Sequence, residues 1–201
     1  MKTKNDKKIF LDVVSAGDCE QIRIWRNNIP ETLRTPFKNT YEQQLDFYTN
    51  VLCNKNSLHK YWGIYVDKFI SELSDGKTKW HMNKLIGMGG ITNIQWENGL
   101  GEISLILGPE FVGKGFGSQA LKLLLNVGFN QLRLNNIFGE CYKCNKNIGF
   151  WENQIKKYNA STAILPLRKY YDGNYWDSLY FNFNEIDFEM ENENGENNGK
   201  D

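Results

Sequence analysis

A glycine-rich loop is the segment whose residue types and spacing best suit chemistry. Within GEISLILGPEFVGKGFGSQALKLLLNVGF, glycines alternate with other residues at Gly113, Gly115 and Gly117. Alternating glycines let backbone N–H groups converge on an anion, and a helix that starts directly afterwards adds its dipole and free amides. The stretch from Val112 to Ser118 therefore predicts a pyrophosphate-binding loop. The alternative is a turn that only leads the chain into the helix.

Two other phosphate-binding loops fit this stretch poorly. A Walker loop needs Gly-Lys followed by Ser or Thr, but Lys114 is followed by Gly115. The dinucleotide fingerprint needs a later acidic residue at the end of a second parallel strand. The strands expected before this loop form an antiparallel meander, which does not suit that fold.

A glutamate stands near the start of the strand that leads into the loop. Strand alternation places Glu102, Ser104 and Ile106 on one face. A carboxylate in this position could take a proton from an amine, directly or through water. The alternative is a glutamate on a solvent-facing strand.

The elements that must position these residues follow from hydrophobic period and turn residues. Ser15–Asp18 and the capping box of Thr40 with Gln43 predict two early helices, and Asp172-Gly173 predicts a closing hairpin. Strands are expected at 9–14, 61–66, 85–94, 102–107 and 136–142, helices after the loop and over 148–158, and a hairpin tip within 71–83. Strand, loop, helix and strand form a crossover, which predicts a parallel pair inside a mixed sheet and an α+β fold.

Composition limits the class of protein. The 201 residues carry 24 Lys+Arg and 24 Asp+Glu, and no apolar run approaches the ~20 residues of a membrane span. We expect a cytoplasmic protein with reduced cysteines, no membrane or nucleic-acid partner and no metal, since Cys141 and Cys144 lack a second pair. Residues 185–201 hold seven acids and one lysine, which leaves 23 bases against 17 acids before them. We expect a domain over 1–184 and a disordered acidic tail over 185–201.

The loop resembles motif A of the GNAT N-acetyltransferases, which reads Gln/Arg-x-x-Gly-x-Gly/Ala. Gly115-Phe116-Gly117 matches the glycines, and Val112 departs from the usual Gln/Arg. Trp25-Arg26-Asn27 is similar to a motif of the subgroup that acetylates ribosomal-protein N-termini and nucleotide-linked amino sugars. The order of elements over residues 8–184 is similar to that family as well.

The resemblance implies a GNAT fold of about seven strands with helices on both faces, and direct transfer from acetyl-CoA to a primary amine. It implies Glu102 as base and Trp25, Arg26 and Asn27 at the acceptor. It implies that acetyl-CoA contacts the following residues: Leu105, Ile106, Leu107, Val112, Gly113, Lys114, Gly115, Phe116, Gly117, Ser118 and Asn145.

The general acid and the acceptor stay open. The family's acid is a tyrosine seven residues after the asparagine matched by Asn145, but Glu152 stands there, so Tyr158 and Tyr142 are the alternatives, as is a mechanism without a protein acid. We expect a small amine, first a nucleotide-linked amino sugar; a protein N-terminus is next, then an aminoglycoside or polyamine. The resemblance also implies a homodimer. The missing tyrosine and the departure at Val112 leave a second hypothesis open, a protein of the same fold that binds CoA without catalysis.

Overall fold

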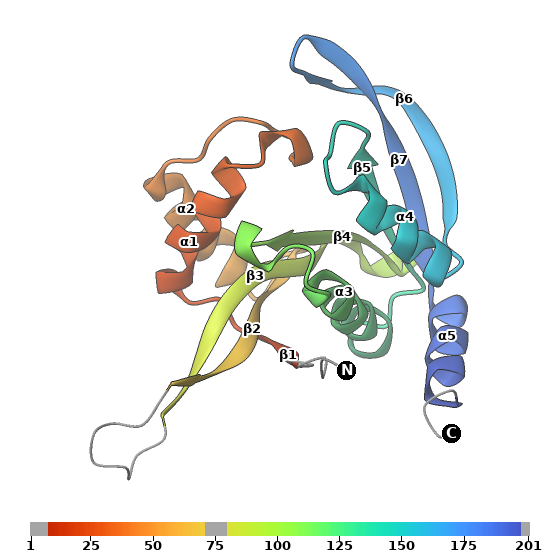
Figure 1. Ribbon diagram of the computed structural model, residues 1–201, viewed down its shortest axis with the longest axis horizontal. Coiled ribbons are helices and arrows are strands. Elements are labelled where there is room, and N and C mark those ends of the chain that lie inside the picture. The colour runs from red at the N-terminus through yellow and green to blue at the C-terminus, as the bar shows by residue number, and fades with distance from the viewer. Residues whose placement is uncertain (1–7, 71–79, 198–201) are drawn as a thin grey trace, which may run out of the picture.

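The computed structural model describes residues 8–70 and 80–197 and has one mixed seven-stranded sheet (Figure 1). The strand order is β1-β2-β3-β4-β5-β7-β6. The strands are β1 Ile9–Asp12, β2 Lys60–Ile70, β3 Trp80–Gln95, β4 Leu100–Leu107, β5 Asn136–Tyr142, β6 Ser161–Tyr171 and β7 Asn174–Asn184. The α+β prediction is confirmed. Residues 71–79 of the expected hairpin tip lie outside the described residues.

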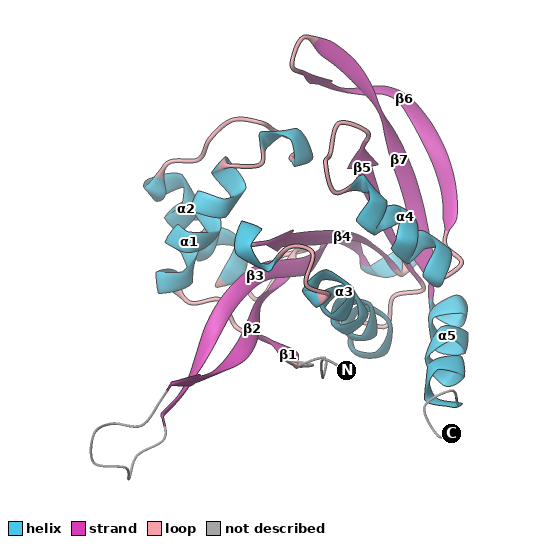
Figure 2. Cartoon of the chain, viewed as in Figure 1, coloured by secondary structure: helices cyan, strands magenta, loops and turns pink. Residues whose placement is uncertain are grey.

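Helices cover both faces of this sheet (Figure 2). They are α1 Ala16–Asn27, α2 Tyr41–Phe47, α3 Phe116–Asn126, α4 Ile148–Lys157 and α5 Glu185–Asn197, with wider turns continuing α2 over Tyr48–Leu52 and α3 over Val127–Gln131. The predicted capping box forms at α2, where Thr40 pairs with Gln43, and the structure shows a second one at α1, between Ser15 and Asp18. Side-chain oxygens thus satisfy amides that have no partner within the helix.

Strands β4 and β5 form the predicted parallel pair, but only at its beginning. Their register runs from Leu100 opposite Asn136 to Glu102 opposite Phe138. Beyond Glu102, β4 pairs with β3 alone, and β5 continues against β7. The sheet therefore splays open beside the second half of β4.

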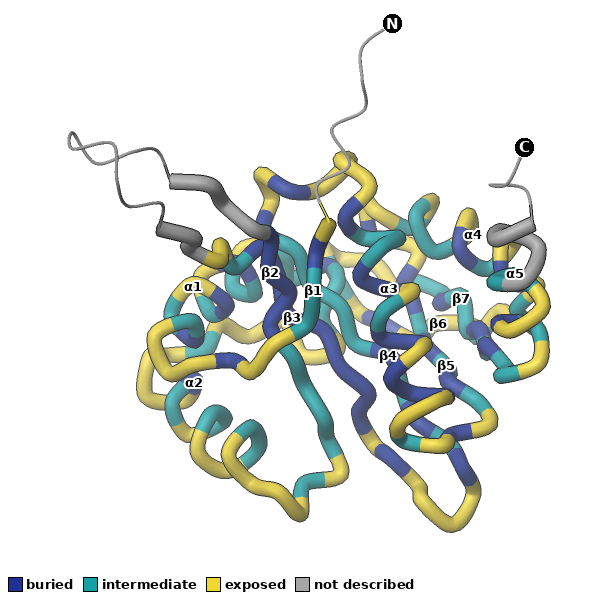
Figure 3. The backbone as a smooth tube through the Cα atoms, turned by 90° about the horizontal axis from the view of Figure 1, so that it is seen from below, coloured by how far each residue is buried: buried dark blue, intermediate teal, exposed yellow. Residues whose placement is uncertain are grey.

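Helix α3 presses the expected apolar stripe against the sheet. Leu121, Leu124 and Leu125 are fully buried, together with Ile91 and Ile137 from the strands. Figure 3 shows buried stretches along α3 and the central strands. Burial of such side chains contributes roughly 1.5–3 kcal/mol each. This packing fixes where the glycine loop enters α3.

The expectation of a disordered tail from residue 185 is wrong for residues 185–197, which form α5. The Asn184 side-chain oxygen accepts from the Asp187 amide at 2.9 Å and caps the helix. Phe188 is 1% exposed and packs its ring 5.3 Å from that of Phe129. One buried aromatic thus anchors an otherwise acidic helix to the core.

The described residues contain neither a membrane-spanning helix nor a cluster of metal ligands. No helix there is long and apolar enough to cross a membrane. No group of three or more His, Cys, Asp or Glu side chains there is placed to hold a metal ion.

Candidate active site

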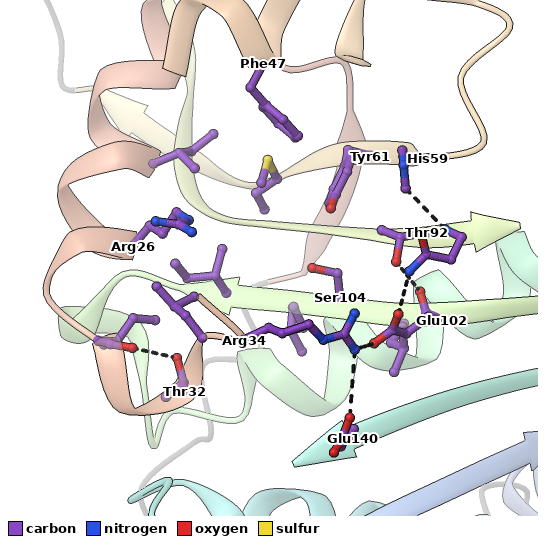
Figure 4. A pocket seen from close by; sticks show the side chains of 18 of the residues that line it. Arg26, Thr32, Arg34, Phe47, His59, Tyr61, Thr92, Glu102, Ser104 and Glu140 are labelled. Atoms are coloured by element: carbon purple, nitrogen blue, oxygen red, sulfur yellow. Dashed lines mark hydrogen bonds and ion pairs between the residues drawn. The ribbon is translucent and has the colours of Figure 1, made fainter. Parts of the chain in front are cut away.

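A cavity of about 470 Å³ lies where β4 and β5 separate. Its walls come from α1, the segment that follows α1, α2 and the splayed strands (Figure 4). Its polar lining includes Arg26, Arg34, Tyr61, Glu102 and Glu140. A cavity with apolar walls and a few converging charges is typical of a small-molecule site.

Glu102 projects from β4 into this cavity with both carboxylate oxygens engaged. Arg34 Nη2 donates to Oε1 at 2.5 Å, and Asn93 Nδ2 donates to Oε2 at 2.7 Å. Its side chain is only 13% exposed. Because Asn93 holds one oxygen, the carboxylate has a fixed orientation and presents Oε1 to the cavity.

A second carboxylate, Glu140 of β5, lies across the splay. Its Oε1 accepts from Ser178 Oγ at 2.7 Å and from Arg168 Nε at 3.0 Å. Desolvation raises its pKa, but these hydrogen bonds and the nearby guanidinium charges outweigh it and hold the pKa of Glu140 below its ordinary value. The sequence argument missed this residue. Strand alternation in β5, with β4 as its parallel neighbour, could have found it.

The glycine loop forms an open backbone cradle at the start of α3. Gly113 and Gly115 have φ of 74° and 82°, and a Cβ at either one would meet no atom within 4 Å. Gly115 is the N-cap of α3, and in the described parts of the chain no side-chain hydrogen bond caps this helix end. Free amides at a helix N-terminus favour an anion such as a phosphate.

Comparisons with known proteins agree with this geometry. The family model described as Acetyltransferase (GNAT) domain matches residues 8–149, more than half of the chain. This chain belongs to the GNAT acetyltransferase family. A curated relative, the uncharacterized N-acetyltransferase p20 of Bacillus licheniformis, is 44% identical over 55 residues, which span 27% of this chain and 31% of that relative's length.

Solved structures share the GNAT fold at low identity. Spermidine N-acetyltransferase from Vibrio cholerae in complex with CoA and spermine has a TM-score of 0.72 at 17% identity, covering 90% of this chain and 97% of that one. A GNAT-family acetyltransferase from Bacillus anthracis has a TM-score of 0.66 at 16% identity, covering 90% and 96%. These likenesses establish the seven-stranded architecture as the GNAT fold.

The structure brings only part of the GNAT-derived site residues to the cavity. Leu105, Ile106 and Asn145 line it, as do Arg26 and Glu102. The loop from Val112 to Ser118 follows β4 as a separate surface, where the Ser118 hydroxyl accepts from Gln154 Nε2 at 3.0 Å. Phe116 is 9% exposed and packs into the core, and Leu107 is not among the lining residues.

Trp25 and Asn27 do not reach the acceptor cavity. Trp25 is 5% exposed and packs edge-on against Phe111 at 6.5 Å, so it belongs to the core. Asn27 instead exchanges two hydrogen bonds of 2.9 Å with the backbone of Asn39. Of the three residues of this motif, Arg26 thus lines the cavity, while Trp25 and Asn27 stabilise the surrounding structure.

The two candidate tyrosines have different positions. Tyr158 is 2% exposed among Phe183 and Phe188, and burial raises its pKa to about 12. Its hydroxyl has no partner among the described residues and does not line the cavity. Tyr142 does line the cavity, with its pKa raised by desolvation. The structure therefore brings only Tyr142 to the same cavity as Glu102.

Proposed function

We propose that this protein transfers an acetyl group from acetyl-CoA to a small cationic amine. The observation that carries the proposal is the pair of carboxylates, Glu102 and Glu140, facing one cavity beside the splayed strand β4. Acetyl-CoA would supply an acetyl group activated as a thioester, and the transfer forms an amide bond, breaks the C–S bond and releases CoA thiol and a proton.

The residues around the α3 loop suit the phosphates of this cosubstrate. The amides after Gly113 and Gly115 stand open, and no Cβ occupies the space beside them. Lys114 adds a positive charge at the exposed turn. Over Leu105 to Leu107 the edge of β4 that faces away from β3 has no strand partner, and its backbone groups would pair with an extended amide-bearing arm as an added strand would.

Glu102 is the residue best placed to take a proton from the acceptor. A primary ammonium has a pKa near that of lysine, about 10.4, so it must lose a proton before its nitrogen can attack. Glu102 Oε1 faces the cavity while Asn93 steadies Oε2. Tyr142, the one of the two candidate tyrosines that lines the cavity, is the residue we assign to return a proton to the departing sulfur.

Paired carboxylates favour an acceptor with positive charge. Two acidic groups attract an ammonium and orient its hydrogens. A polyamine meets that requirement, and a protein of the same fold binds spermine with CoA. We therefore extend the polyamine class to this chain as part of the proposal.

A nucleotide-linked amino sugar is the second candidate, favoured by Arg26. Its guanidinium borders the cavity and donates to two uncharged oxygens, the Phe37 carbonyl at 3.2 Å and Thr35 Oγ1 at 3.4 Å. No carboxylate in the described parts of the chain lies within ion-pair distance of it. A phosphate-bearing acceptor would give that cation a partner.

A single assay separates these functions. Acetyl-CoA is incubated with spermidine, an amino-sugar nucleotide, an aminoglycoside and an N-terminal peptide in parallel, and free thiol is measured. We expect thiol release with spermidine above the no-acceptor rate. Preference for the nucleotide supports the second candidate and preference for the peptide supports N-terminal acetylation. If acetyl-CoA raises the melting temperature but no amine is acetylated, the chain is a CoA-binding protein.

A further inference from the structure

Arg34 occupies the position that an acceptor cation needs. Its Nη2 lies 2.5 Å from Glu102 Oε1 and 3.9 Å from Glu140 Oε2, so one nitrogen faces both carboxylates (Figure 4). An ammonium placed at that nitrogen would face the same two oxygens. With Arg34 in place, both oxygens of Glu102 are engaged, and the carboxylate facing the cavity is already paired.

We propose that Arg34 is a specificity-determining residue that stands in for the acceptor's cation and must be displaced before the acceptor binds. This inference rests on the proposed function and adds a regulation to the same site. Competition with an internal guanidinium selects for acceptors that are cationic at the reacting end. A neutral molecule in the cavity would leave the pair of Arg34 with Glu102 intact.

The surroundings allow the side chain to leave while its backbone stays. The Arg34 side chain is 60% exposed, and an exposed ion pair contributes little free energy, so displacing the side chain into water costs little. Desolvation lowers the pKa of Arg34, but the charges of Glu102 and Tyr142 and the hydrogen bonds with them together outweigh it and raise the pKa, so the guanidinium stays charged throughout. The contact therefore depends on charge and can be exchanged for another cation.

A buried lysine binds the backbone of the segment that carries Arg34. Lys169 of β6 is 5% exposed, and its ammonium donates to the Leu33 carbonyl and, at 3.1 Å, to the Pro30 carbonyl. Cys144 Sγ also lies 3.5 Å from the Glu31 carbonyl. These contacts fix the backbone next to Arg34, so its side chain reaches the same two carboxylates each time it returns.

The alternative is that Arg34 contacts the acceptor and helps to bind it. The two cases predict opposite changes in KM when the guanidinium is removed. They also differ in what lysine can do, because lysine keeps the charge of Arg34 but not its planar fork.

The test compares Arg34→Gln, Arg34→Lys and the control Lys143→Gln. Lys143 pairs with Asp177 at 3.2 Å outside the cavity, so its substitution removes one charge without touching the site. For Arg34→Gln we expect the acceptor KM to fall roughly fivefold with kcat nearly unchanged, the factor that an exposed ion pair corresponds to. Arg34→Lys should stay near the wild-type KM, and Lys143→Gln should match wild type.

An unchanged or increased acceptor KM in Arg34→Gln overturns the inference. If wild type acetylates no amine of the panel, the proposed function fails separately. Arg34 is then tested by titrating spermidine into CoA-saturated protein in a calorimeter. Tighter binding to Arg34→Gln than to wild type still supports displacement, and equal or weaker binding contradicts it.

Discussion

The loop before α3 and the cavity beside β4 differ in the groups that they offer to a charged ligand. The loop offers bare backbone amides, with Gly113 and Gly115 leaving open space around them. In the cavity the charged side chains are already paired: Arg34 pairs with Glu102, and Arg168 pairs with Glu140. Backbone amides do not titrate and cannot move away as side chains can, so the loop presents the same groups to an anion at every pH. The side-chain network can rearrange, which is why our proposal assigns acceptor selection and proton transfer to the cavity.

The largest effect expected from this comparison is in the cavity. Glu102→Gln keeps the shape and the Asn93 contact but removes the base, and we expect kcat to fall about 10²–10⁴-fold, the typical range for general acid–base catalysis. The KM for acetyl-CoA should change little, because the loop is untouched. Steady-state kinetics over pH 6–9 measure both.

The matched control is Glu97→Gln, an exposed glutamate on the turn before β4. It should behave as wild type. Turnover by Glu102→Gln that equals wild type throughout this pH range removes Glu102 from the mechanism.

The second carboxylate should affect binding and stability more than turnover. Glu140→Gln loses a charge that would face the acceptor, and we expect the acceptor KM to rise about tenfold. Because its pKa is lowered in the fold, ionised Glu140 stabilises the protein above the unfolded value of about 4.3, and that stability is lost as pH falls through the folded value.

Chemical unfolding at several pH values tests this second carboxylate. The stability difference between wild type and Glu140→Gln should be constant from pH 7 to about 5 and shrink below about 4.3. An unchanged acceptor KM would mean that Glu140 acts only through its contacts with Ser178 and Arg168. A stability difference that grows in acid would contradict the lowered pKa of Glu140.

The same contrast explains how far sequence reasoning reaches. The loop is contiguous in the sequence, so the glycine pattern from Gly113 to Ser118 is enough to predict its backbone geometry. Local capping signals likewise placed α1 and α2 correctly. The cavity joins residues distant in the chain: Arg34 and Glu102 are 68 positions apart. Nothing local marks them as neighbours, and the splay of β4 from β5 that brings them together is a property of the sheet.

Two aromatic residues show where local sequence patterns predict the wrong environment for a side chain. Phe188 sits among acidic and amide residues that predict disorder, yet its burial against Phe129 orders α5. Trp25 belongs to a motif that suggested substrate contact, yet tertiary packing places it in the core. Local composition cannot report which single side chain finds a buried site.

A change in the loop should affect the cosubstrate alone. Gly115→Ala adds a Cβ at φ 82°, where there is space but the left-handed conformation costs a non-glycine residue about 1–2 kcal/mol. We expect the KM for acetyl-CoA to rise up to about tenfold while the acceptor KM stays constant. Gly149→Ala in helix α4 is the control, since that glycine has no positive φ and should tolerate alanine. An equal rise in both KM values would show that the loop and cavity are not independent.

The smallest effect tests whether the loop gains anything from side chains. Val112 is 43% exposed and stands where the GNAT motif carries Gln or Arg, so Val112→Gln restores a polar group beside the cradle without crowding it. One added hydrogen bond contributes about 0.5–1.5 kcal/mol, which corresponds to a two- to tenfold lower KM for acetyl-CoA. Val112→Leu, which adds bulk but no donor, is the control. If glutamine leaves that KM unchanged, the backbone amides alone bind the phosphates. If leucine lowers it equally, packing and not hydrogen bonding is the cause.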